Sequence, residues 1–233
     1  LDRFGMFGTR AVFYFGHLSL AEAFLGRFAQ ARAEAEEARR AAEDSGRPVD
    51  RYAALFYGCH ARLLAGPDPA LAAELESLAE ECRRRVPSPF YPALLARLAQ
   101  AQMAIGRLDA ASATLDALGD AASRFGTGQF GLQGEAIGAV LAASRGAPDA
   151  PARLAAAREA VRAGRDPWME ALVLRAQARL GGQGADATAA EALALAQAHG
   201  FVVEAAHAHL LIARLARADD PAAAAASEKE AAR

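Results

Sequence analysis

Residues 93–118, ALLARLAQAQMAIGRLDAASATLDAL, decide the fold. Apolar side chains recur there every three or four positions on both sides of Gly106, which is the spacing of one face of an α-helix. A glycine just past the end of a helix takes the left-handed backbone conformation that ends it. The stretch therefore predicts two amphipathic helices joined by a tight turn at Gly106.

Glycines that follow apolar helical segments recur along the chain at a nearly constant interval. Gly26, Gly66, Gly106 and Gly146 are 40 residues apart, and Gly181 follows after 35. A second set falls about midway between the first: Gly46, Gly126, Gly164 and Gly200. Fixed periods of this length are typical of stacked helical hairpins. We therefore expect an all-α, right-handed α-solenoid of about five helical hairpins plus a terminal helix.

The composition agrees with helices and excludes other classes. Alanine, the best helix former, accounts for 65 of the 233 residues, whereas Val, Ile and Thr together number only 15. The formal net charge is −2. Nucleic-acid binding needs a basic surface that displaces phosphate counterions, so we expect no nucleic-acid binding through this region.

The helix boundaries follow from the glycines, from prolines and from aspartates. Pro92 and Pro167 suit a first helical turn, and Asp50, Asp149 and Asp186 stand where N-caps are expected. The predicted helices are 9–25 and 28–44, 50–65 and 69–85, 90–105 and 107–124, 130–145 and 149–163, 167–180 and 186–199, and a final helix at 201–218. The repeat domain thus covers 1–218 in units of about 9–46, 50–86, 90–126, 130–164 and 167–200, and 219–233 is a tail or linker.

Neither a secretory signal nor a membrane span is predicted. The most apolar stretch, 11–25, has 15 residues and includes His17 and Glu22, whereas a bilayer core needs about 20 apolar residues. Cys59 and Cys82 fall too far apart on neighbouring helices for a disulfide, so we expect two buried thiols. This pattern favours a cytoplasmic protein.

The turn sequences resemble those of tetratricopeptide repeats. Residues 25–31 (LGRFAQA) and 106–111 (GRLDAA) carry a glycine, then an aromatic residue or leucine two positions on, then an alanine three further on. Prolines change the turn at 66–69 (GPDP) and 146–149 (GAPD), and the 40-residue period exceeds the usual length of about 34. The aromatic residue that this family has late in the first helix is replaced by Glu22, Arg62 and Gln102.

Residues 3–31 also resemble a narrower group. Arg3-Phe4-Gly5, Ala11-Val12-Phe13 and the turn at 25–31 are similar to the C-terminal repeat regions of bacterial signalling ATPases, LuxR- or MalT-type regulators and class III nucleotide cyclases. The resemblance implies a regulatory segment whose output domain lies elsewhere. It also leads us to expect a longer parent protein, with Phe4, Phe7 and Phe13 packed on a missing upstream repeat or domain.

Catalytic, metal and cofactor motifs are not evident in the sequence. The five histidines (17, 60, 199, 207 and 209) include no pair at the four-residue spacing that places two imidazoles on one helical face. Cys59 and His60 are adjacent and so face different directions on a helix. The only lysine is Lys229, and no glycine-rich phosphate loop precedes it. We therefore expect neither an enzyme nor a metal or cofactor site.

The residues that the repeat frame places on an inner, concave face form the predicted partner groove. They are Phe13, Leu20, Phe24, Phe56, His60, Gln100, Met103, Gln133, Trp168 and Arg175. A groove with aromatic residues at one end and amides and an arginine at the other suits a peptide or an amphipathic ligand. In the competing interpretation Phe13, Phe15 and Phe24 only pack between helices. An error of one residue in aligning the repeat with the chain would exchange these two interpretations.

The function hypothesis is a non-catalytic module that binds a protein or peptide, serving as a scaffold or sensor in a bacterial signalling or transcription-regulatory protein. The alternative is a small-molecule effector domain that uses the same groove. An all-α enzyme would need clustered polar groups of perturbed acidity facing one cavity. RNA-reading helical repeats are disfavoured by the charge of −2.

Overall fold

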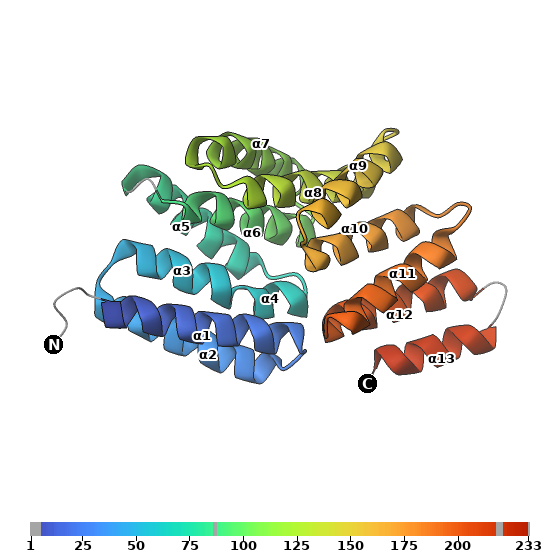
Figure 1. Cartoon of the computed structure of the whole chain (residues 1–233), viewed down its shortest axis with the longest axis horizontal. Helices are drawn as coiled ribbons and strands as arrows, with labels where there is room; N and C mark the ends of the chain where they lie inside the picture. The colour runs from blue at the N-terminus through green and yellow to red at the C-terminus, as the bar shows by residue number, and fades with distance from the viewer. Residues whose placement is uncertain (1–5, 86–87, 218–220, 233) are drawn as a thin grey trace. The chain divides into compact units, whose positions relative to one another are not determined.

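The computed structural model describes residues 6–85, 88–217 and 221–232, and helices are the only regular elements within these ranges (Figure 1). The prediction of an all-α chain is therefore confirmed. The helices are α1 (Met6–Phe24), α2 (Phe28–Ser45), α3 (Pro48–Gly58), α4 (His60–Ala65), α5 (Pro69–Arg85), α6 (Phe90–Ala104), α7 (Leu108–Phe125), α8 (Gly128–Ser144), α9 (Ala150–Ala163), α10 (Pro167–Leu180), α11 (Ala185–Ala198), α12 (Val202–Ala216) and α13 (Pro221–Ala231).

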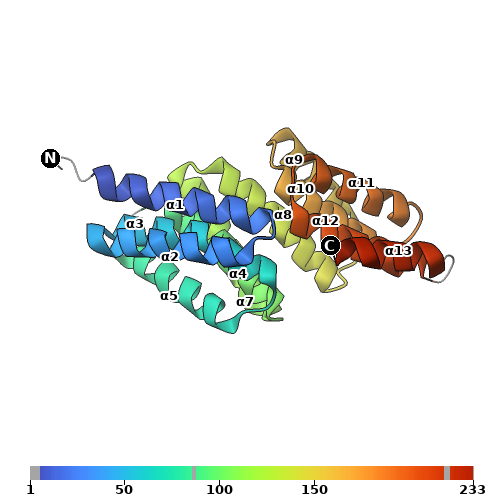
Figure 2. The same ribbon diagram turned by 90° about the horizontal axis from the view of Figure 1, so that it is seen from below.

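The chain divides into two compact units, unit 1 (Leu1–Gly134) and unit 2 (Glu135–Arg233), with the boundary inside α8. In unit 1, α1 packs on α2, α2 on α3, α5 on α6 and α6 on α7, and α3 also contacts α1 and α6. Figure 1 shows α3 and α4 between the α1–α2 pair and the α5–α6 pair, and Figure 2 shows α2 and α5 on the same side of this unit. In unit 2 the same neighbour packing runs from α9 to α13. Such neighbour packing is what helical hairpins need to bury their apolar stripes.

Small residues let these helices approach closely. The buried face of α2 consists of Ala31, Ala38 and Ala42. Gly16 and Gly58 have no room for a side chain, because a Cβ on either would lie 2.9 Å from a carbon of a facing helix. The abundance of alanine therefore supports tight helix packing as well as helix formation.

The glycine turns are confirmed with one exception. The predicted glycines at 26, 46, 66, 106, 126, 146, 181 and 200 all have positive φ. The prediction for Gly164 is wrong, because its φ is −74° and Arg165 takes the left-handed conformation instead, with φ of 56°. The turn after α9 needs its left-handed residue one position later than the glycine, so an arginine bears the strain.

The helix starts are partly as predicted. Asp149 stands at the N-cap of α9, but Asp50 and Asp186 lie in the first turns of α3 and α11. The helix α3 begins earlier because Pro48 occupies its first position, where the missing N–H costs nothing. Gly184 takes the N-cap of α11.

Glu22, Arg62 and Gln102, which the resemblance aligns with the late aromatic residue of tetratricopeptide repeats, make polar contacts. Each of these three side chains joins its helix to the following turn or helix. The contacts are Glu22 with Arg27 at 3.3 Å, Arg62 with Asp68 and with Glu74 at 2.7 Å each, and Gln102 with the hydroxyl of Thr114 at 2.8 Å.

Two elements differ from the predicted ranges. The predicted helix 50–65 is two helices, α3 and α4, separated at Cys59. Residues 221–231, within the predicted tail, form α13, which packs on α12. Cys59 and Cys82 are buried free thiols, as predicted. Phe4 and the side chain of Phe7, predicted to contact an upstream repeat, lie outside the described residues.

Candidate functional site

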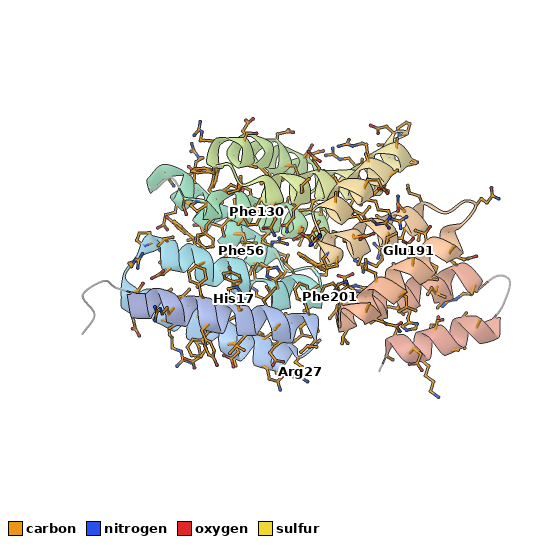
Figure 3. The ribbon with its side chains drawn as sticks, in the orientation of Figure 1. His17, Arg27, Phe56, Phe130, Glu191 and Phe201 are labelled. Carbon is orange, nitrogen blue, oxygen red and sulfur yellow. The ribbon has the colours of Figure 1, made fainter. Side chains whose placement is uncertain are left out.

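Five aromatic rings from four helices of unit 1 meet in one cluster, here called the aromatic cluster: Phe13, Phe56, Tyr57, Phe90 and Phe130. The ring centroids of Phe13 lie 5.9 Å from Tyr57 and 6.2 Å from Phe90. Those of Phe56 lie 6.1 Å from Phe90 and 5.8 Å from Phe130 (Figure 3). All five rings are partly buried. Contacts at these distances stabilise the packing of α1, α3, α6 and α8.

Two more residues of the predicted groove extend this cluster. His60 lies 6.0 Å, centroid to centroid, from both Phe24 and Phe56. Leu20 on α1 and Met103 on α6 are partly buried in the same unit. Aromatic rings of neighbouring helices thus meet, as expected when such side chains pack between helices, and their role as a ligand surface stays a prediction.

A buried arginine that the sequence analysis did not single out joins the two predicted glutamines. Arg97 on α6 is 1% exposed, and its guanidinium lies 5.6 Å from the ring centroid of Phe56. Its Nη1 donates to Oε1 of Gln100 at 2.6 Å, and its Nη2 donates to Oε1 of Gln133. An arginine among the leucines and alanines of 93–99 was the available signal. Both glutamines therefore orient Arg97, and the bond to Gln133 joins α6 to α8.

Cys59 and His60 have the residue types of a nucleophile and a base, but their protonation states are unsuited to that chemistry. Their Sγ and Nδ1 atoms lie 3.9 Å apart, and Nδ1 also lies 3.1 Å from the carbonyl oxygen of Tyr57. Burial raises the pKa of the Cys59 thiol to about 12. Burial, reinforced by Arg97, lowers the pKa of His60 to about 3. At neutral pH the thiol stays protonated and the imidazole neutral, so no thiolate forms.

The last two residues of the predicted groove belong to unit 2 and form a cluster with Glu204 there. The indole Nε1 of Trp168 donates to Oε1 of Glu204 at 3.4 Å. Nε of Arg175 and Oε2 of Glu204 lie 3.1 Å apart in a buried ion pair, without hydrogen-bond geometry. Burial lowers the pKa of Arg175, and Glu204 opposes that shift. The ion pair joins α10 to α12.

A cavity of about 600 Å³ lies on unit 1 at a place that the sequence analysis did not predict. It follows α2, α3, α4 and α5, and we call it the outer trough. Its lining residues are Arg32, Ala35, Glu36, Arg39, Ala42, Glu43, Arg51, Ala54, Leu55, Gly58, Cys59, Arg62, Glu74, Ser77, Leu78 and Glu81. None of the predicted groove residues lines it.

The outer trough combines small apolar residues with ion pairs. Ala35, Ala42 and Ala54 line this cavity and supply little side-chain bulk. Four arginines and four glutamates line the same cavity. The ion pairs are Arg39 with Glu36 and Glu43, Arg51 with Glu81, and Arg62 with Glu74. The trough therefore presents apolar surface together with charges of both signs.

Within the described ranges no group of three metal-ligating side chains is close enough to hold a metal ion. No helix in the same ranges is sufficiently long and apolar to cross a bilayer. No family model matches the chain, and no curated protein matches it.

Proposed function

We propose that this chain is a non-catalytic helical-repeat module that binds a protein or peptide partner through unit 1. The outer trough carries the proposal, because it is a cavity of about 600 Å³ between helices, with an apolar surface between charged walls. The resemblance to tetratricopeptide repeats supports the same role. The narrower resemblance of residues 3–31 supports a role as a regulatory or scaffold segment of a bacterial signalling or transcription-regulatory protein.

The state of Cys59 and His60 supports a non-catalytic role. A cysteine nucleophile needs a lowered pKa and access to substrate, whereas Cys59 is fully buried and has its pKa raised to about 12. A general base works best with a pKa near the working pH, whereas that of His60 is lowered to about 3. Both groups therefore contribute to packing.

A small-molecule effector is the second candidate, and the trough volume favours it. Cavities that hold small ligands measure about 300–1,000 Å³, a range that includes the volume here. Such a ligand would use the apolar surface for affinity and one or two of the charged side chains for orientation.

A selection experiment separates the two candidates. The full chain is immobilised and used to select from a display library of random 16-residue peptides, and its melting temperature is measured with a panel of small charged metabolites. We expect enriched peptides that bind the full chain in solution. A rise in melting temperature with a metabolite, without any enriched peptide, would favour the effector function. If no peptide is enriched and no metabolite raises the melting temperature, both functions are contradicted.

A further inference from the structure

We propose that the outer trough holds one α-helix of a partner protein, about three turns long, with small residues facing the trough and an acidic and a basic residue about two turns apart along one edge. The inference rests on the proposed function, because it assumes that the module binds a protein or peptide. It specifies the secondary structure and side-chain pattern of the partner.

The lining residues form straight stripes along the helices. On α2 they fall at positions 32, 35, 36, 39, 42 and 43, and on α3 and α4 at 51, 54, 55, 58, 59 and 62. Both sets have three- and four-residue spacing, and each covers twelve residues, whose ends lie about 16 Å apart at a rise of about 1.5 Å per residue. The stripe crosses the break at Cys59 because this residue keeps right-handed helical angles. A cavity bounded by such stripes is elongated, which suits a rod more than a compact molecule.

The helices that border the trough favour a helical occupant. The walls α2 and α5 both pack on α3, and small residues of α2 and α3 line the space between them. Helices pack at about 8–10 Å between axes, and small residues at the contact give the shorter distances. Ala54 lines the cavity on α3 and therefore allows a fourth helix to approach α3, provided that its facing residues are small. An extended strand would find no free sheet edge here, because its neighbours are helices whose backbone groups are already bonded.

The charges on α2 define the edge of the partner helix. Arg32 forms no ion pair with any residue that the structure describes, whereas Arg39, seven residues later, is shared by Glu36 and Glu43. This wall thus has a surplus positive charge at its beginning and a surplus negative charge two turns further on. A complementary helix places a carboxylate near Arg32 and a cation near the glutamates, about 10 Å apart.

The test uses the selected 16-residue peptides with two pairs of variants of the full chain. Ser77→Trp fills the trough from an exposed position on α5, and Ala73→Trp places the same side chain on the same helix outside it. Arg32→Gln removes the surplus cation, and Arg40→Gln removes an arginine of α2 outside the trough. Circular dichroism checks that all four variants keep the helix content of the unchanged chain.

The expected result is at least ten-fold weaker binding to Ser77→Trp and about two- to five-fold weaker binding to Arg32→Gln, the range of one exposed ion pair. Both control variants should bind as the unchanged chain does. The peptides should lose affinity on proline substitution at their centre, because proline breaks a helix. Peptides that bind all variants equally, or that tolerate central proline, would overturn the helix-in-trough inference and leave the proposed function intact. If no peptide is enriched at all, the proposed peptide-binding function fails as well.

Discussion

The buried ion pair of unit 2 gives the most direct test of the packing. The side chains of Arg175 and Glu204 are only 7% and 3% exposed, and their charged atoms lie 3.1 Å apart. Glu204→Gln keeps the shape of the side chain and an acceptor for Trp168 but leaves the arginine charge buried without its counter-charge. Removing one partner of a buried pair costs about 3–5 kcal/mol. We expect a loss of about 3 kcal/mol in the free energy of unfolding, because the amide oxygen still accepts hydrogen bonds.

The single tryptophan makes this loss measurable in the right unit. Trp168 is the only tryptophan of the chain, and its indole contacts Glu204, so its fluorescence during urea unfolding reports on unit 2. The matched control is Glu228→Gln, which removes the exposed ion pair with Arg217 in the same unit and should cost less than about 1 kcal/mol.

A double variant isolates the cost of the uncompensated charge. Arg175→Met with Glu204→Leu replaces the pair by apolar side chains of similar size, and such replacements are often neutral or stabilising. We expect the double variant to be within about 1 kcal/mol of the unchanged chain, well above Glu204→Gln in stability. If Glu204→Gln costs no more than Glu228→Gln, the pair is not buried as described and the reasoning fails.

Three further predictions concern backbone strain, close packing and titration. Gly58→Ala should destabilise unit 1 by about 1–3 kcal/mol through overpacking against Ala35. Gly119→Ala, at a helical site with open space, should instead stabilise unit 1 by about 1 kcal/mol. If both variants change the free energy of unfolding in the same direction in urea titrations, the close packing at Gly58 is contradicted. Arg165→Gly should raise the melting temperature, because it removes the strain of a left-handed backbone at a residue with a side chain, which costs about 1 kcal/mol. An unchanged or lower melting temperature would refute this strain. Because the pKa of His60 is lowered to about 3, the unfolded chain takes up a proton first, so stability falls as the pH drops from about 6.5 towards 3. Between pH 7 and pH 5 this loss is about 2 kcal/mol, and it should be absent in His60→Gln when unfolding is followed by tyrosine fluorescence.

The helical architecture could be predicted because its signals are local. A glycine at a helix end, alanine within the helix and an apolar residue every three or four positions act on a few neighbouring residues. Gly26 and Gly106 could therefore be assigned from their immediate surroundings. Gly164 was assigned wrongly because the position of a left-handed residue depends on the exact end of α9, which packing sets.

The predicted groove includes residues of the aromatic cluster but none that lines the outer trough. Phe24 and Phe56 both lie beside His60, as expected when such side chains pack between helices, and the role of these residues as a groove stays a prediction. Arg97 was missed because a single charged residue in an apolar stripe does not reveal whether amides elsewhere can satisfy it. Gln133 does so from 36 residues away.

By itself, the sequence determined that this chain is all-helical, that glycines divide it into hairpins and that its two cysteines are buried thiols. The tertiary structure alone decided that small residues of α2 and α3 leave an open trough beside α5, that Arg97 is held by two glutamines and that Arg175 pairs with Glu204. The physical reason is the distance along the chain over which the interactions act. Helix formation depends on interactions within about one turn, whereas a cavity or a buried charge depends on which distant side chains the packing brings to the same place.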